Sequence, residues 1–157
     1  MRIIVMSDSH GAEHIVAGII RSHPEAEVFI HCGDGAEEFL RQAKLLPAAF
    51  ICVRGNNDFV AQPNDQKTVS LGGKTFFIVH GHRHLAHGNK NTLLYAGLEA
   101  KADVVLFGHT HARHLSEAGE KPLLVNPGSV ALPRDVDPSY AVLDIENGEV
   151  RVRFEEA

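Results

Sequence analysis

The stretch Ile3-Ile4-Val5-Met6-Ser7-Asp8-Ser9-His10-Gly11 decides the fold, because a short apolar run passes directly into polar residues with metal-ligand chemistry. Four similar blocks follow along the chain: Gly33-Asp34, Gly55-Asn56-Asn57-Asp58, His80-Gly81-His82 and Gly108-His109-Thr110-His111. Each block comes at the end of an apolar run that predicts a buried strand, or two residues beyond it. Because the carboxyl ends of neighbouring strands meet at one edge of an α/β sheet, we expect the five blocks to converge there.

The apolar runs around these blocks predict a layered α/β fold. Strands are expected over residues 3–6, 28–30, 49–53, 68–71, 75–79, 104–107, 123–125, 140–145 and 150–154. Helical spacing of apolar residues predicts helices after Gly11, over residues 37–44 and over residues 91–101. Strand and helix alternate in the first part of the chain, which favours parallel pairing, whereas the carboxyl half is rich in strands. The predicted fold is α/β, with two mixed β-sheets packed face to face and flanked by helices, an α/β/β/α sandwich.

Length and composition narrow the class of protein. A chain of 157 residues fits one domain over residues 1–157. Lys and Arg number 15 against 20 Asp and Glu, a net charge of −5, so no general basic surface is expected and a long nucleic acid is not an expected partner. No window reaches the ~20 apolar residues that span a bilayer, and the apolar start is too short for a signal peptide. Cys32 and Cys52 lie at apolar strand positions, which predicts buried reduced thiols and a cytoplasmic protein.

The five blocks together supply seven oxygen and imidazole donors, and we predict that these hold metal. The donors are Asp8, His10, Asp34, Asn56, His80, His109 and His111. Taken singly, Asp8 could cap the following helix, and Asp34 or Asn56 could be turn residues. Two histidines on either side of Thr110, directly after a buried strand, have no such packing or propensity reason. One carboxylate bridging two ions would give each ion four protein ligands and leave positions open for water and substrate. The remaining positive charge favours phosphate substrates.

These blocks resemble the calcineurin-like metallophosphoesterases, and closely the small bacterial and archaeal phosphodiesterase branch. The resemblance covers almost the whole chain and includes the segment Asn126-Pro127-Gly128-Ser129, for which we expect a supporting role beside the metal loops. It implies the fold described above. It also implies that Asp8, His10, Asp34 and His111 hold one ion, while Asp34, Asn56, His80 and His109 hold the other. Two divalent ions are expected, with Mn²⁺ implied by the resemblance and Fe, Zn, Ni or Co compatible with the donors.

The function predicted from this site is a phosphodiesterase that hydrolyses small phosphate esters by in-line attack of a metal-bridging hydroxide at a dinuclear centre, with Asn56 counted as a catalytic residue. Many relatives carry a histidine at the position of Asn57, thought to protonate the leaving oxygen. An amide cannot act as a general acid, so easily departing leaving groups are favoured. His82 is a candidate replacement for that acid, and Asn57 and Arg83 are candidate substrate-binding residues.

Several alternatives stay open at this point. The chain could be a phosphomonoesterase on small substrates, or a metal-binding scaffold without turnover, because the superfamily includes a protein-trafficking subunit. A nuclease ranks lower, since the sequence offers no platform on which bases could stack. Formation of a homo-oligomer is left open. Glu37 and Glu38 are expected to be exposed residues of the second helix.

Overall fold

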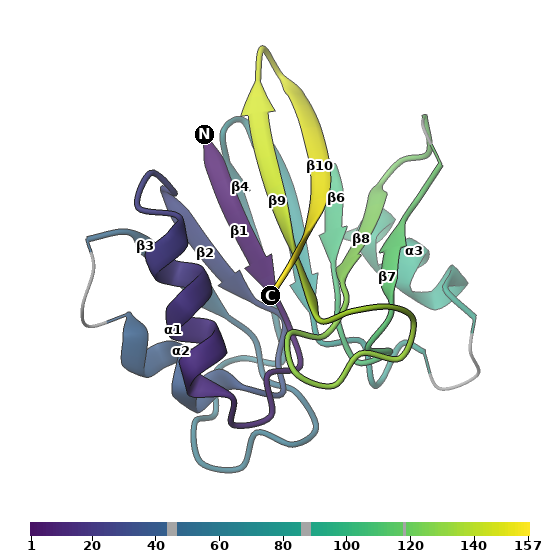
Figure 1. The fold of residues 1–157 in the computed structure, drawn as a ribbon. Coiled ribbons are helices and arrows are strands. Elements are labelled where there is room, and N and C mark those ends of the chain that lie inside the picture. The colour runs from purple at the N-terminus through teal and green to yellow at the C-terminus, as the bar shows by residue number, and fades with distance from the viewer. Residues whose placement is uncertain (44–46, 86–88, 118) are drawn as a thin grey trace.

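The computed structural model describes residues 1–43, 47–85, 89–117 and 119–157. Within these residues the chain forms ten strands and three helices (Figure 1). In chain order they are β1 (Arg2–Met6), α1 (Glu13–Ser22), β2 (Val28–His31), α2 (Ala36–Gln42), β3 (Ala49–Cys52), β4 (Gln66–Leu71), β5 (Lys74–Val79), α3 (Asn91–Glu99), β6 (Val104–Leu106), β7 (Arg113–Leu115), β8 (Leu123–Pro127), β9 (Ser139–Glu146) and β10 (Glu149–Glu156).

The strands form two five-stranded sheets, and both are mixed. The first sheet has the order β10-β9-β1-β2-β3 and the second the order β4-β5-β6-β8-β7. In the first sheet β1, β2 and β3 pair in parallel, and in the second β5, β6 and β8 do so. Strands β9, β10, β4 and β7 join by antiparallel pairing. The carboxyl ends of β1 and β2 point to the lower end of the molecule in Figure 1.

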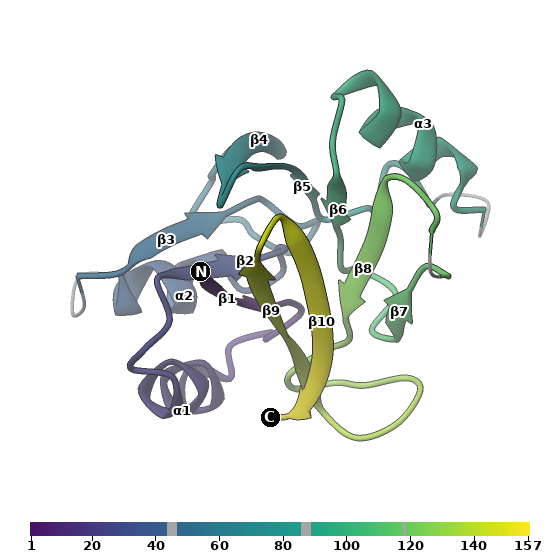
Figure 2. The same cartoon turned by 90° about the horizontal axis from the view of Figure 1, so that it is seen from above.

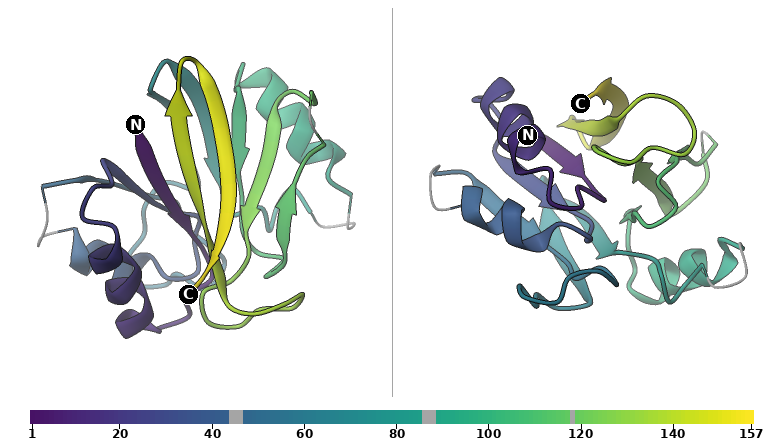
Figure 3. Two further views of the ribbon diagram at one scale, coloured as in Figure 1. Left: turned by 45° about the horizontal axis from the view of Figure 1, so that its top comes forward. Right: turned by 60° about the horizontal axis from the view of Figure 1, so that its bottom comes forward.

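Three apolar layers hold the sheets and helices together. Side chains alternate along a strand, so in β1 Ile3 and Val5 enter the core between the two sheets, whereas Ile4 and Met6 pack toward the helices. Helices α1 and α2 cover the outer face of the first sheet, and α3 covers that of the second (Figures 2 and 3). The order helix, sheet, sheet, helix is the α/β/β/α sandwich that the sequence predicts, so the predicted fold class is confirmed.

The elements differ from the prediction in a few places. Strand β7 was not expected, and α3 ends at Glu99 rather than at residue 101. The last residue of the predicted helix over residues 37–44 lies outside the described residues. Cys32 and Cys52 are both buried and free, as expected. Over the part of the chain that the structure describes, no helix has the length and apolar character needed to cross a membrane.

Candidate metal centre

The five donor blocks lie in the loops that follow β1, β2, β3, β5 and β6, and hydrogen bonds from backbone amides join these loops to one another. In the first sheet, the amide of Asp8 donates to the carbonyl of Gly33 and that of His10 to the carbonyl of Asp34, each at 3.0 Å. In the second sheet, the amide of Gly108 donates to the carbonyl of His80 at 3.0 Å. The amide of Asn57 donates to Asp34 at 2.8 Å and that of His109 to Asp8 at 3.0 Å, which brings in the block after β3 and joins the two sheets. The five blocks therefore converge as predicted.

Five of the seven predicted donors have a left-handed backbone. The φ angles are 53° at Asp8, 44° at His10, 57° at Asp34, 68° at His109 and 59° at His111. Residues other than glycine adopt this conformation at a cost of about 1–3 kcal/mol and concentrate at functional sites. The alternative in which Asp8 caps α1 is wrong, because the N-cap is Ala12 and has no side-chain cap bond.

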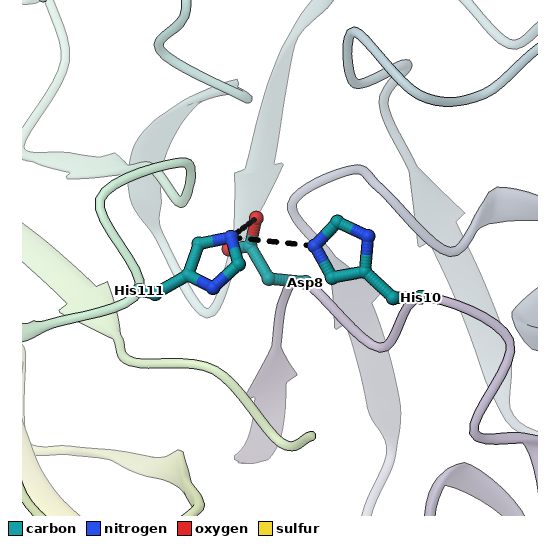
Figure 4. Close-up of side chains that lie close together, drawn as sticks. All are labelled: Asp8, His10 and His111. Carbon is teal, nitrogen blue, oxygen red and sulfur yellow. Dashed lines mark hydrogen bonds and ion pairs between the residues drawn. The ribbon is translucent and has the colours of Figure 1, made fainter. Parts of the chain in front are cut away.

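A first cluster brings together Asp8, His10 and His111. The Nε2 atoms of His10 and His111 lie 3.3 Å apart, and Nε2 of His111 lies 3.3 Å from Oδ1 of Asp8 (Figure 4). One ligand atom from each of the three side chains fits within 4.8 Å of the others. That spacing suits donors around a single ion.

A second cluster adjoins the first and is formed by Asp8, Asp34 and His80. Nε2 of His80 lies 3.5 Å from Oδ2 of Asp34 and 4.0 Å from Oδ1 of Asp8. The side-chain oxygen of Asn56 lies 3.1 Å from the same nitrogen. Oδ2 of Asp34 is also 3.9 Å from Nε2 of His10, so this carboxylate lies between histidines of both clusters.

His109 approaches the second cluster from β6. Its ring centroid lies 5.2 Å from that of His80, and its backbone amide donates to Oδ2 of Asp8 at 3.0 Å. All seven predicted donors are therefore neighbours in space.

Hydrogen bonds to carbonyl oxygens set the tautomers of two histidines. Nδ1 of His80 lies 2.8 Å from the carbonyl oxygen of Cys32, and Nδ1 of His111 lies 2.6 Å from that of Leu132. A carbonyl oxygen only accepts, so in each ring Nδ1 carries a proton, and whenever the imidazole is neutral its lone pair is on Nε2. This is the arrangement of metal-binding histidines, whose second nitrogen donates to a backbone or carboxylate oxygen.

The donor set fits divalent metal ions. Oδ1 of Asp8 is buried and has no hydrogen-bond partner among the described residues, although Nε2 of His111 faces it. Burial alone would raise the pKa of Asp34, but His80 and Asn57 hold it below its usual value, so this carboxylate is ionised. Asp8 raises the pKa of His111, which means that a proton and a metal ion compete for Nε2. When Nε2 of His111 carries no proton, a metal ion between this nitrogen and Oδ1 of Asp8 would remove the repulsion between their lone pairs.

Asp58 joins two of the metal loops, a role that sequence reasoning missed. Its Oδ1 accepts the amides of Gly35 and Ala36, at the start of α2. Its Oδ2 accepts the amides of Asp34 and Gly55. The signal available in the sequence was a carboxylate three residues after Gly55, inside a donor block. In three of the four bonds, however, the partner lies more than twenty residues away along the chain.

The segment Asn126-Pro127-Gly128-Ser129 supports the loops from the second sheet, as expected. Nδ2 of Asn126 donates to the carbonyl of Gly108 at 2.8 Å, and Oγ of Ser129 donates to the carbonyl of Asp8 at 2.8 Å. Oγ of Ser129 in turn accepts the amide of Leu132, whose carbonyl receives His111.

A buried polar chain lies behind the first donor loop and corrects the expectation for Glu38. Glu38 is only 6% exposed, because its Oε1 accepts Oγ of Ser9 at 2.8 Å and the amide of Gly11 at 2.7 Å. The amide of Gly33 donates to Nδ1 of His31, so Nε2 of that ring carries the proton and donates to Ser9 at 3.0 Å.

The imidazole of His31 stays neutral within this network of buried polar groups. Its complete burial lowers the pKa of the imidazole from 6.5 to about 4, although the carboxylates of Asp8, Asp58 and Glu38 oppose the shift. When His80 is protonated, its charge lowers the pKa of His31 further. A neutral ring is what the hydrogen bond from Gly33 requires.

The candidate residues beside the donors lie on two sides of the cluster. Asn57 donates to Asp34 from its backbone amide at 2.8 Å and from Nδ2 at 2.6 Å, so it positions that carboxylate, and its contact with substrate stays a prediction. The ring of His82 lies 5.5 Å from that of His80. Arg83 is exposed and forms an ion pair with Asp65 at 2.7 Å.

Two cavities touch the donors. One of about 360 Å³ is lined by His10, Asp34 and the segment of residues 57–61, and one of about 40 Å³ by His80, His82 and Arg83, among others. A larger cavity of about 630 Å³, beside α1 and β2, is lined by none of the seven donors. His10 and Asp34 therefore open onto the cavity of about 360 Å³.

Two mixed sheets whose strand ends gather carboxylates and imidazoles form the architecture of a metal-dependent hydrolase. The calcineurin-like phosphoesterase superfamily domain matches residues 1–148, and the chain belongs to this family. YsnB of Bacillus subtilis, a probable metallophosphoesterase, is 40% identical over 159 residues, which cover 98% of this chain and 90% of YsnB. The phosphodiesterase MJ0936 of Methanocaldococcus jannaschii is 31% identical over 170 residues, which cover 96% and 97%. The solved structure of an archaeal phosphodiesterase has a TM-score of 0.78 at 28% identity and covers 99% of this chain and 100% of that one.

Proposed function

We propose that this phosphoesterase is a phosphodiesterase with a dinuclear metal centre that hydrolyses small phosphate esters. One ion would be held by Asp8, His10, Asp34 and His111, and the other by Asp34, Asn56, His80 and His109. One observation carries the proposal. Nε2 of His80 faces Asp34 and Nε2 of His111 faces Asp8, while Nδ1 of each ring donates to a backbone carbonyl. MJ0936 and the archaeal protein of known structure are both phosphodiesterases, which supports the choice of a diester.

When bound, two divalent ions would activate a water for in-line attack and neutralise charge on the phosphoryl oxygens. The chain itself positions the donors. Asn57 directs two hydrogen bonds at Asp34, which sets the direction of the carboxylate between the two clusters. Since Nδ2 of Asn57 is engaged in this way, it gives no help to the leaving oxygen, and substrates with a good leaving group are favoured.

We propose His82 as the proton donor that partly replaces the missing acid. It lines the small cavity together with His80, and its ring lies 6.2 Å from that of His109. Rates of His82→Gln and of the unchanged protein, measured on aryl diesters of graded leaving-group pKa, test this role. The loss should grow as the leaving group becomes poorer, and an equal loss for every ester contradicts it.

The central experiment uses protein stripped of metal and reloaded with Mn²⁺, Fe²⁺, Zn²⁺, Ni²⁺ or Co²⁺, one ion at a time. We expect two ions per chain by elemental analysis, the highest turnover with Mn²⁺, and faster hydrolysis of a bis-aryl phosphate than of an aryl monophosphate or a cyclic nucleotide. Asp34→Asn should lose both ions or one, together with activity. Asp103→Asn, at an exposed carboxylate on the far end of β6, is the matched control and should keep both.

The outcomes separate the alternatives. Faster turnover of the monoester favours a phosphomonoesterase, and two bound ions without turnover of any ester favour the scaffold. A chain that binds no ion contradicts the whole proposal. Hydrolysis at a chiral phosphorus should proceed with inversion, since no covalent enzyme intermediate is involved. The buried free thiols of Cys32 and Cys52 support our proposal of a reducing, cytoplasmic environment.

A further inference from the structure

We propose that Phe59 and Val60 form a subsite for an uncharged aromatic ester group of the substrate. This proposal rests on the proposed function and narrows its substrate class. In the phosphodiesters concerned, the ester group that remains after hydrolysis carries an uncharged aromatic ring.

The position of the two side chains is the first argument. The cavity of about 360 Å³ is lined by His10 and Asp34 from the metal centre and also by Phe59, Val60 and Ala61. A pocket of that size is at the lower end of those that hold small ligands. A phosphoryl group at the donors would thus have one of its ester groups next to Phe59.

The exposure of these side chains is the second argument. Phe59 is 76% exposed and Val60 is 78% exposed. Other exposed apolar side chains occur on this surface, but single ones are normal and need no explanation. Two in succession, on the wall of the cavity that reaches the donors, offer a surface on which an aromatic ring can stack.

The segment that carries Phe59 is held in place on both sides. Asp58, directly before it, accepts four backbone amides from the loops at Asp34 and Gly55. After it, Nε2 of Gln62 donates to the carbonyl of Phe59 at 3.1 Å. The two apolar side chains are therefore presented by an ordered loop, which lowers the entropic cost of binding a ring there.

The charges around the cavity decide the kind of ester group. Its charged lining residues are Glu37, Glu38 and Asp58 in addition to the donors, and none of the described residues that line it is lysine or arginine. The neighbouring Arg41 is engaged by Glu37 at 2.7 Å and by Glu13. A second phosphate on the substrate would meet carboxylates here, whereas a neutral ring would meet Phe59.

The test compares two phosphodiesters that share the p-nitrophenolate leaving group, p-nitrophenyl phenyl phosphate and p-nitrophenyl methyl phosphate, so that phosphorus keeps either a phenoxy or a methoxy group. The metal-loaded protein should prefer the phenyl compound by about tenfold in kcat/KM, the effect expected of one aromatic contact. In Phe59→Ser the ratio should fall toward one. Tyr95→Ser, at an aromatic side chain that is 66% exposed on α3, should leave the ratio unchanged. An unchanged ratio in Phe59→Ser overturns the proposal.

A second readout needs no turnover. The chain has no tryptophan, so Phe59→Trp gives a single tryptophan as a fluorescent reporter at the subsite. Phenylphosphonate should change its emission at about tenfold lower concentration than methylphosphonate does. If the two phosphonates change the emission at the same concentration, the proposal is overturned. It is also overturned if Phe59→Ser changes the oligomeric state, measured by light scattering, and leaves the preference for the phenyl compound as it was. If no diester is hydrolysed, the proposed function fails, while the phosphonate titration still judges the subsite.

Discussion

Replacement of Asp58 by asparagine should destabilise the fold by about 4 kcal/mol. The carboxylate accepts two amides at each oxygen, at distances between 2.7 and 2.9 Å. Asparagine keeps one acceptor oxygen and puts an NH₂ group in place of the other, so two backbone amides lose their acceptor and face a donor. Each hydrogen bond to a charged group contributes about 1.5–3 kcal/mol, and each partly buried amide left without a partner adds a cost of its own.

The loss of these hydrogen bonds should also disturb the metal centre. Two of the four amides belong to Asp34, a proposed metal ligand, and to Gly55, which directly precedes the proposed ligand Asn56. Urea denaturation of the metal-free protein, followed by circular dichroism, measures the free energy of unfolding. Elemental analysis of the reloaded variant should show fewer than two ions. Asp103→Asn is the control, since the carboxylate of Asp103 accepts one exposed amide, from Thr75. This substitution should lower the free energy of unfolding by only about 1 kcal/mol. An Asp58→Asn variant within about 1 kcal/mol of the unchanged protein would refute the reasoning.

Three further predictions concern packing, pH and metal. Gly108→Ala should lower the free energy of unfolding by about 1–3 kcal/mol, because a Cβ there would overlap Oγ of the buried Ser7, whereas Gly18→Ala, with open space around it, should raise it by up to about 1 kcal/mol; urea denaturation measures both. The depressed pKa of His31 contributes stability that is present above pH 6.5 and is lost as the pH falls toward 4, so unfolding free energy should drop by about 2 kcal/mol more between pH 7 and 4.5 in the unchanged protein than in His31→Gln. Removal of the metal by a chelator should lower the melting temperature, measured by calorimetry, by about 5–10 °C relative to protein saturated with the ion. A drop of similar size on chelation of Asp34→Asn would contradict the assigned site.

The sheets and the location of the donors are predictable because both depend on local pattern. Apolar runs of three to five residues identify the parallel strands, and a donor directly after such a run must lie at a strand end. Strand β7 escapes this logic, since Arg113-His114-Leu115 has no apolar run. It forms because β8 offers it an antiparallel edge, with His114 opposite Asn126. Its existence depends on a partner in space rather than on its own residues.

The supporting residues of the site are not predictable for the same physical reason. Glu38 has the sequence context of an exposed helix residue, yet Ser9 and Gly11 draw its carboxylate into the interior. Asp58 reads as one more turn residue of a donor block, although it joins two loops. Glu38 is buried and Asp58 partly buried, because backbone amides from other loops, and for Glu38 also the hydroxyl of Ser9, satisfy their carboxylates. Such partners become visible only when the strands have been assembled.

The supporting bonds also explain how the chain keeps five donors in a left-handed backbone. Bonds from Asn126 and Ser129 to the carbonyls of Gly108 and Asp8, and the bonds to Asp58, need only the folded sheets and no metal. The conformational cost of ordering the donors is therefore met when the chain folds, and little of it remains when an ion binds. A preformed donor set would serve an enzyme and a metal-binding scaffold equally well. The two alternatives consequently differ in what happens at the open positions beside Asp34 and Phe59, and turnover of a diester rather than donor geometry is the property that separates them.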